Sequence, residues 1–111
     1  MAAKFEIYKD KAGEFRFRLK AANGQNILAS EGYSKKASAM NGVESVKKNS
    51  QDPKRFQASQ TPAGKHRFVL TATNGQTIGT SQSYSSESSC KNGMESVAKS
   101  AKDAKVDDQT D

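Results

Sequence analysis

The stretch NGMESVAK, at residues 92–99, repeats with two changes the stretch NGVESVKK at residues 41–48. The agreement extends outward in both directions. The chain from Phe5 aligns without an insertion with the chain from Phe56, and close to half of the aligned residues are identical. Self-similarity at a fixed spacing indicates an internal duplication. We therefore interpret the chain as two tandem copies of one unit, from about residue 5 to 54 and from about 56 to 105.

Each copy has the same pattern of strands ahead of the repeated stretch. A short strand begins at Phe5 or Phe56, and a loop that contains glycine follows it. The segment EFRFRLKA, at residues 14–21, then alternates apolar and basic residues, which is typical of an antiparallel strand with one buried face. Asn-Gly at residues 23–24 and 74–75 predicts two-residue type I′ hairpins, in which both central residues have positive φ. A third strand follows each hairpin.

The repeated stretch lies in a predicted helix. Ser34 and Ser85 are expected as N-caps, and apolar residues spaced i, i+4, i+7 form one stripe in each copy. Gly42 and Gly93 interrupt neither stripe, so we place them inside the helices, at a contact too close for a Cβ. A helix that begins only at Gly42 is the alternative. The two stripes are Ala39, Val43 and Val46, and Cys90, Met94 and Val97.

Neither copy has enough large apolar residues to fold alone, because a unit of about 50 residues buries little surface. We therefore expect a single α+β domain over residues 1–111, a monomer with one shared core and an approximate two-fold relation between the copies. The expected architecture is two tandem strand-strand-strand-helix(-strand) repeats in one antiparallel sheet, with both helices packed on one face. Composition predicts a partly disordered polar tail at residues 106–111.

The chain resembles the YegP-like family of uncharacterised small bacterial proteins. The opening FEIYKDKAGEFRFR at residues 5–18, the Asn-Gly-Gln hairpins and the Asn-Gly-x-Glu-Ser-Val helices carry the resemblance, which extends to about Lys99. It implies repeats of three strands, a helix and a further strand, with the strands after the helices exchanged between the halves. Residues 105–107 would then pair at a sheet edge, with residues 54–56 as their equivalent, and disorder would begin at about Gln109. The resemblance implies no established activity, cofactor or substrate.

Composition and charge limit the class of protein. The formal charge is +6 and only 33% of the residues are hydrophobic. Residues 1–55 hold 12 basic and 6 acidic residues, against 6 and 6 in residues 56–111. No apolar run approaches the ~18 residues that a membrane helix needs, so we expect no membrane association. The single cysteine, Cys90, fits a reducing cytoplasm.

No residue pattern indicates catalysis. The one histidine, His66, aligns with Phe15 at the start of a strand, and Cys90 lies on an apolar helix stripe, where cysteine behaves as a small hydrophobe. Glu44 and Glu95 fall on exposed helix positions. The sequence contains no phosphate loop, dinucleotide fingerprint or Cys/His cluster. We therefore expect no catalytic residue, no cofactor and no metal.

The strongest candidate for a binding surface is the sheet face that the helices leave open. Basic residues interleaved with an aromatic on such a face can bind single-stranded nucleic acid or another polyanion. The same charges can equally serve only to keep an open sheet from aggregating. We favour a non-catalytic interaction module of unknown ligand, then a weak nucleic-acid or polyanion binder, and last an enzyme. The candidate residues are Lys9, Lys11, Arg16, Arg18, Lys20 and Arg67, with Tyr8 beside them.

Overall fold

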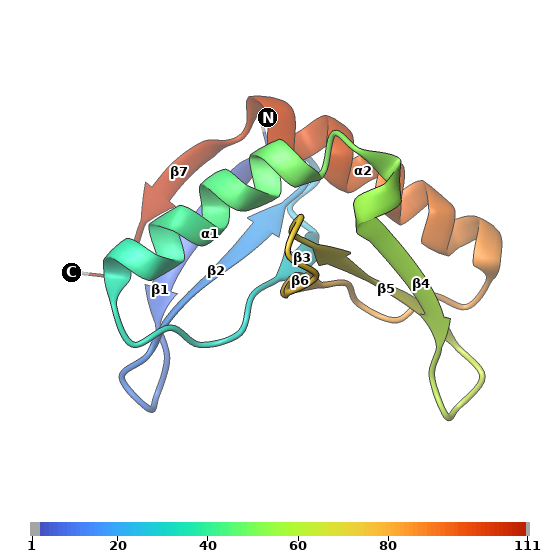
Figure 1. Ribbon diagram of the computed structural model, residues 1–111, viewed down its shortest axis with the longest axis horizontal. Helices are drawn as coiled ribbons and strands as arrows, with labels where there is room; N and C mark the ends of the chain where they lie inside the picture. The colour runs from blue at the N-terminus through green and yellow to red at the C-terminus, as the bar shows by residue number, and fades with distance from the viewer. Residues whose placement is uncertain (1–2, 111) are drawn as a thin grey trace.

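A computed structural model describes residues 3–110 of the chain as one sheet with two helices (Figure 1). The elements are β1 (Lys4–Lys9), β2 (Phe15–Lys20), β3 (Asn26–Ala29), α1 (Lys36–Asn49), the 3₁₀ helix η1 (Pro53–Arg55), β4 (Phe56–Gln60), β5 (His66–Thr71), β6 (Thr77–Thr80), α2 (Glu87–Asp103) and β7 (Lys105–Asp108). The seven strands lie in the order β4-β5-β6-β3-β2-β1-β7. The predicted α+β class is confirmed: each copy supplies three strands followed by a helix, and β7 follows the second helix.

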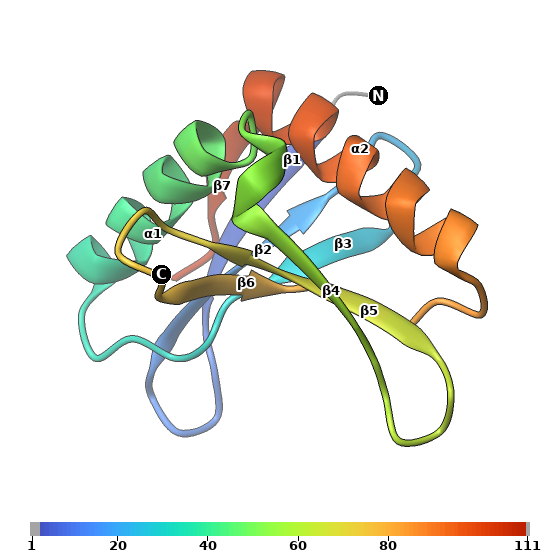
Figure 2. The same ribbon diagram turned by 45° about the vertical axis from the view of Figure 1, so that its right-hand side comes forward.

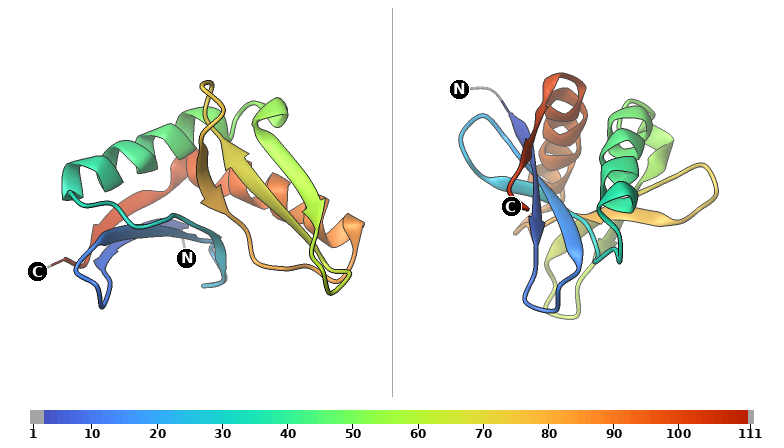
Figure 3. Two further views of the ribbon diagram at one scale, coloured as in Figure 1. Left: turned by 60° about the horizontal axis from the view of Figure 1, so that its bottom comes forward. Right: turned by 90° about the vertical axis from the view of Figure 1, so that its left-hand side faces the viewer.

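Both helices lie on the same face of the sheet (Figures 1 and 2). The sheet is strongly twisted, so the strands of the first copy run at a steep angle to those of the second (Figure 3). The two sets of strands meet where Ala29 of β3 pairs with Thr80 of β6. One cluster of buried residues lies between sheet and helices and draws on both copies. Its largest members are Phe5, Ile7, Phe17, Leu19, Leu28, Phe68 and Leu70.

The glycine of the repeated stretch is the point where α1 meets the sheet. A Cβ on Gly42 would lie 2.6 Å from Cε2 of Phe17 and 3.0 Å from the hydroxyl oxygen of Tyr33. Real Cβ atoms essentially never come as close to another atom as the first of these distances. The predicted close contact inside the helix is therefore confirmed. The alternative, a helix that begins only at Gly42, is wrong because α1 begins at Lys36.

The second copy repeats this contact. A Cβ on Gly93 would overlap the hydroxyl group of Tyr84 and lie 3.1 Å from Cε2 of Phe68. In each copy the Phe ring and the Tyr ring stack at an interplanar angle of 12°. The glycine of each repeated stretch thus allows a stacked pair of rings to lie directly beneath the helix.

The hairpins differ from the predicted type I′ turns. Between β2 and β3, the N–H of Gly24 donates to the carbonyl oxygen of Ala21 at 2.9 Å. The N–H of Ala21 donates in turn to the carbonyl oxygen of Gln25, also at 2.9 Å. These bonds enclose a three-residue loop in which only Gly24 has positive φ, of 86°. Asn23 instead accepts a side-chain hydrogen bond from the N–H of Gln25 at 3.0 Å. The same bonds recur between β5 and β6. Glycine therefore supplies the left-handed position alone, and asparagine stabilises the turn through its side chain.

The N-caps lie one residue beyond the predicted serines. Ser86 caps α2, and its Oγ accepts a hydrogen bond from the N–H of Ser89 at 3.1 Å. Lys35 holds the equivalent position in α1 and makes no side-chain cap bond. Ser34 and Ser85 are therefore not the caps, and only the second helix begins with a side-chain acceptor for its free N–H groups.

The sheet is mixed rather than wholly antiparallel, because β7 runs parallel to β1. Val106 lies opposite Phe5, and Asp108 lies opposite Ile7. All other strand pairs are antiparallel. The chain leaves α2 beside the start of β1, so the following residues can only run along β1 in its own direction (Figure 1). The expectation of a wholly antiparallel sheet is therefore wrong for the pair of β1 and β7.

The predicted strand at residues 105–107 is confirmed and is one residue longer than expected. The polar tail that we expected over residues 106–111 begins later, because residues 106–108 belong to β7. Beyond β7, the N–H of Gln109 still donates to the carbonyl oxygen of Ile7 at 2.7 Å. Asp111 lies outside the described residues.

The equivalent segment between the copies, residues 54–56, does not form an exchanged strand. Pro53–Arg55 form η1, and Phe56 is already the first residue of β4. Consequently no strand of the described chain pairs with the outer side of β4, which ends the sheet. Figure 2 shows β4 at the front of the molecule with this side uncovered.

Candidate functional site

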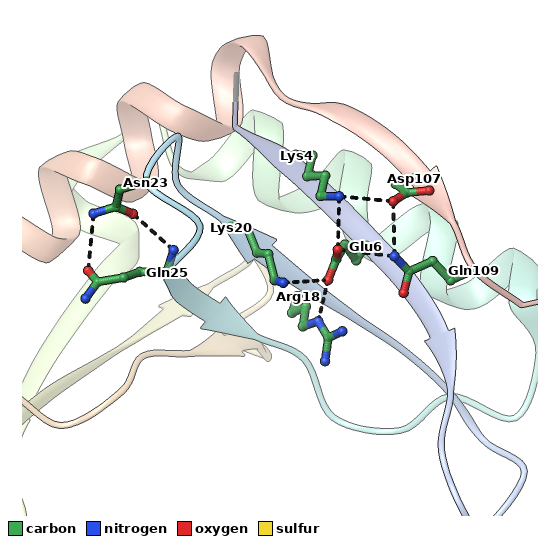
Figure 4. Close-up of polar contacts among 8 residues, drawn as sticks. All are labelled: Lys4, Glu6, Arg18, Lys20, Asn23, Gln25, Asp107 and Gln109. Carbon is green, nitrogen blue, oxygen red and sulfur yellow. Dashed lines mark hydrogen bonds and ion pairs between the residues drawn. The ribbon is translucent and has the colours of Figure 1, made fainter. Parts of the chain in front are cut away.

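Three cations on the open face of the sheet surround one carboxylate (Figure 4). Arg18 Nε donates to Glu6 Oε1 at 2.7 Å, and Lys20 Nζ lies 3.4 Å from the same oxygen. Lys4 Nζ lies 3.2 Å from Glu6 Oε2. The strand register places Glu6 directly opposite Arg18 and Lys4 opposite Lys20. Alternation along β1 and β2 thus brings these four side chains together on one face.

Glu6 is the centre of this cluster and is only 3% exposed. Burial by itself would raise the pKa of Glu6, but the hydrogen bonds from Arg18 and Lys4 and the charges of Arg18 and Lys20 lower that pKa to about 2. Gln109, which follows β7, also donates its Nε2 to Glu6 Oε2 at 3.2 Å. The carboxylate is therefore ionised at neutral pH and ties β1, β2 and the segment after β7 together.

The sequence pattern indicated Arg18 and Lys20 of this cluster, but neither Lys4 nor Glu6. Glu6 occupies the face of β1 opposite to Phe5 and Ile7, so alternation alone puts it on the open face. Its pairing with Arg18 follows from the strand register, which the Asn-Gly loop between β2 and β3 does not fix. Because Glu6 lies among these cations, the net positive charge of the predicted basic face is lower than the number of its cations suggests.

The remaining predicted cations do not join this cluster. Arg16 Nε donates to Asp10 Oδ2 at 2.6 Å, and this bond lowers the pKa of Asp10. Lys9 Nζ lies over the ring of Phe15, 5.3 Å from its centroid. Among the described residues, Lys11 and Arg67 have no carboxylate partner, and both are exposed. The six candidates thus form separate groups rather than one continuous basic patch.

The second copy lacks the carboxylates as well as most of the cations. Gln57 holds the position of Glu6, and Thr61 holds that of Asp10. Val69 and Thr71 stand where the first copy has Arg18 and Lys20. Charge on the open face is therefore concentrated on the first copy, where Glu6 and Asp10 offset part of it.

The residues considered for chemistry are both at least partly buried. His66 is half-buried at the start of β5, and its backbone pairs with that of Tyr84. Cys90 is 1% exposed, and burial raises the pKa of its thiol. Within residues 3–110, no group of three His, Cys, Asp or Glu side chains is placed to hold a metal ion. None of the helices in the described part of the chain is long and apolar enough to cross a membrane.

The outer edge of β4 carries backbone groups that face away from the sheet. On β1, the carbonyl of Ile7 accepts from Gln109, so the backbone groups of Ile7 face outward. Ala58 lies opposite Phe68, in the same register in which Ile7 lies opposite Phe17. In an antiparallel pair, both polar groups of a residue point to the same side. The N–H and C=O of Ala58 therefore face solvent, with no strand to receive them among the described residues.

An apolar groove lies at the start of β4, between α2 and the connection that leads from α1 to β4. It has a volume of about 310 Å³. Phe56, Met94 and Ala98 line it, and all three are half-buried. Gln51 closes one side by donating its Nε2 to the carbonyl oxygen of Ala98 at 2.8 Å. The other lining residues are Ser50, Pro53, Lys91 and Glu95.

The first copy shows how the same region is arranged when a strand lies on the edge. Phe5 and Val43, the equivalents of Phe56 and Met94, are at most 1% exposed. There β7 lies along β1, and Asp108 of β7 forms an ion pair with Lys36 of α1. The exposed groove in the second copy is therefore the counterpart of a surface that β7 helps to bury in the first.

The repeat, the mixed sheet and the two helices are those of a known family. Two segments, residues 10–57 and 62–108, match the family described as "Domain of unknown function (DUF1508)". These segments cover most of the chain, one in each copy, and the chain therefore belongs to this family.

The relatives of this chain are YegP-like bacterial proteins, as the sequence resemblance indicated. The UPF0339 protein in the ptx operon 5' region of Stutzerimonas stutzeri is 60% identical over 106 residues, which cover 96% of each chain. The UPF0339 protein YegP of Yersinia pestis is 44% identical over 106 residues, which cover 96% of this chain and 95% of that one. The solution NMR structure of the Escherichia coli protein of unknown function yegP has a TM-score of 0.93 at 42% identity, covering 99% of this chain and 95% of that one. None of these three relatives carries the name of an enzyme.

Proposed function

We propose that the protein is a non-catalytic binding module that takes up an extended segment of another polypeptide along the outer edge of β4. One observation carries this proposal: the β1 edge of the sheet is covered by β7, while no strand among residues 3–110 covers the β4 edge, which lies beside an apolar groove. Peptides that add a strand to an exposed sheet edge gain affinity from main-chain hydrogen bonds and specificity from alternate side-chain pockets. Both components are present at β4.

We infer that the two copies are related by an approximate two-fold axis, which is broken at the sheet edges. The matching registers of β1 on β2 and of β4 on β5 support this relation. At the centre, Ala29 pairs with Thr80, its own equivalent in the second copy. The β1 edge is filled because a strand follows α2, whereas the residues after α1 must continue into β4. The tandem arrangement thus leaves one of two equivalent edge sites for a partner.

The composition of β4 is compatible with a reversible partner. The strand FQASQ contains no charged residue, and prolines flank it at residues 53 and 62. Proline and charge near an edge are common means to keep it from pairing with copies of itself. The chain is therefore expected to remain monomeric until a suitable segment occupies the edge. Cys90, a buried free thiol, fits a reducing compartment such as the cytoplasm.

The second candidate function is weak binding of nucleic acid or another polyanion on the open sheet face. It is supported by the exposure of Lys11 and Arg67, which no described carboxylate neutralises. It is weakened by the ion pairs that already engage Arg16, Arg18 and Lys20. Such binding would fade steeply with salt, whereas strand addition would depend on salt only modestly.

The test is selection from a random peptide library displayed on phage, followed by mapping of the selected peptides on the labelled protein by NMR. We expect the amide signals of residues 55–60 and 91–98 to shift. Ala58→Pro removes one outward N–H without touching the ladder to β5, and should abolish binding while the protein stays folded. Ala98→Phe, which fills the groove without changing the strand, serves as a second blocking variant. Arg67→Gln is the control and should bind as the parent does.

Three outcomes would contradict the proposal. The first is selected peptides that map to the open face and are lost in Arg67→Gln, which would favour the polyanion surface instead. The second is binding that survives in both Ala58→Pro and Ala98→Phe. The third is a library that yields no peptide whose signals map to β4.

A further inference from the structure

The covered edge of the sheet specifies what each position of an added strand contacts. In the parallel register, Val106 lies opposite Phe5 and therefore on the helix-facing side. Asp107 lies opposite Glu6 on the open face, where its Oδ2 accepts from Lys4 Nζ at 3.3 Å. Asp108 returns to the helix-facing side and pairs with Lys36 of α1. An added strand thus places alternate residues toward the helix, and the second of these residues meets the first turn of that helix.

The second copy changes two of these contact positions. Glu87, in the first turn of α2, stands where the first copy has Lys36, so the charge at this point is reversed. Ala58 stands where the first copy has the fully buried Ile7, so the space beside the edge is larger. Phe56 keeps the aromatic ring of Phe5 at the groove. Compared with the first copy, the β4 edge therefore keeps an aromatic residue at its apolar position and carries the opposite charge at the first turn of the helix.

These differences disfavour a second copy of the chain as the occupant. The C-terminal strand of another copy would bring Asp108 next to Glu87, and like charges in contact repel. A lysine or arginine at that point would instead meet an exposed carboxylate at the start of a helix. Its long stem would fit over the small Ala58. Charge complementarity thus indicates a segment of a different protein.

We propose that the β4 edge selects an extended segment of another protein that runs parallel to β4, with an aliphatic residue opposite Phe56 and a lysine or arginine opposite Ala58. The aliphatic side chain occupies the groove between Phe56, Met94 and Ala98. The basic side chain pairs with Glu87. The residue between them points to the open face and is polar. This specificity rests on the proposed function of the β4 edge, and it adds the direction and the pattern of the ligand.

The test uses two peptides with blocked ends, AKVDKQ and AKVDDQ, titrated into the labelled full-length chain. The second has the sequence of residues 104–109, and the first differs from it only in the lysine that would lie opposite Ala58. We expect AKVDKQ to shift the amides of residues 55–60 and to bind about threefold more tightly at low salt, as an exposed ion pair allows. This preference should disappear at high salt.

Reversal of one charge on the protein gives the decisive comparison. In Glu87→Lys the preference should invert, so that AKVDDQ binds more tightly than AKVDKQ. Glu44→Lys is the matched control, because it makes the same charge change at an exposed position of α1 that does not line the groove, and it should leave the preference for AKVDKQ intact. A spin label on the peptide N-terminus should broaden the signals near Arg55 for a parallel strand, and those near Gln60 for an antiparallel one.

Failure of this inference and failure of the proposed function give different results. Peptides that bind at β4 with equal affinity in the parent and in Glu87→Lys would overturn the charge pattern and leave the edge site standing. Antiparallel broadening would overturn the stated direction alone. Absence of any shift at β4, with library-selected peptides also failing there, would overturn both. Concentration-dependent dimers that pair through β4 would identify the occupant as a second copy and overturn the partner that we propose.

Discussion

Glu6 offers the sharpest test of the folded structure, because one carboxylate holds together three cations on the open face. Glu6→Gln keeps the size of the side chain and removes its charge. The pKa of Glu6 is lowered from 4.5 to about 2 in the folded protein. A difference of this size corresponds to a stabilisation of roughly 3 kcal/mol at neutral pH. The substitution should also leave Arg18, Lys20 and Lys4 close together without their shared anion.

The pH dependence identifies the source of the loss. A carboxyl group with a lowered folded pKa stabilises the folded state above its unfolded pKa, here near 4.5. That contribution falls as the pH decreases from about 5 toward 2, because the unfolded chain takes up the proton first. The difference in stability between the parent and Glu6→Gln should therefore be largest near pH 7 and should narrow steadily below pH 5.

The assay is urea unfolding of both proteins at several pH values and constant ionic strength. Other carboxylates with low pKa values, such as Asp108, titrate in both proteins and cancel in the difference. Gln57→Glu places the same carboxylate at the equivalent position of the second copy, where Val69 and Thr71 replace the two cations. We expect it to change stability by less than about 0.5 kcal/mol. A loss in Glu6→Gln that stays constant from pH 7 to pH 2.5 would refute the electrostatic reasoning.

Three further predictions concern the helices and the covered edge. Gly42→Leu should destabilise the protein by roughly 1–3 kcal/mol through overpacking against the ring of Phe17, and an unchanged urea midpoint would contradict the close contact. Ser86→Ala should lower the free energy of unfolding by about 1 kcal/mol in a thermal melt, because Ser86 caps α2. Ser85→Ala should leave the free energy of unfolding almost unchanged in the same measurement. Deletion of residues 105–111 should speed hydrogen exchange in β1 far more than in β5, and equal protection in both would show that β7 does not stabilise the edge.

Much of the fold could be predicted from the sequence because the duplication reports the same elements twice. Alternation in EFRFRLKA fixes which residues of β2 face the core, and Phe17 and Leu19 are indeed completely buried. Gly42 inside a helix indicates a close contact whatever its partner is. The turn type was harder to predict, because Asn-Gly suits both a two-residue loop and a three-residue loop in which only glycine has positive φ. The direction of β7 depends on where α2 returns the chain, and no local pattern records this.

The candidate site could be predicted only in part, for a related reason. The cations of β2 are visible as an alternating pattern, but their neutralisation by Glu6 depends on the register between two strands. The bare edge of β4 follows from a topological fact, since residues 54–56 cannot both cover an edge and begin a strand. Glu87 and Ala58 are unremarkable in the sequence. Their proposed role in binding can be inferred only from the structure, because the contacts of β7 show which residues an equivalent strand on β4 would meet.

The pairing of β7 with β1 also has a consequence for biosynthesis. Residues 4–7 pair with residues 105–108, so the strand that is made first receives its neighbour last. While the chain emerges from the ribosome, the outer side of β1 stays open until α2 and the residues after it have been made. Contacts between residues so far apart in sequence are slow to form, and open strand edges invite aggregation in the meantime. Closure of this edge therefore cannot precede the synthesis of β7, and a nascent chain stalled within α2 would expose two open edges instead of one.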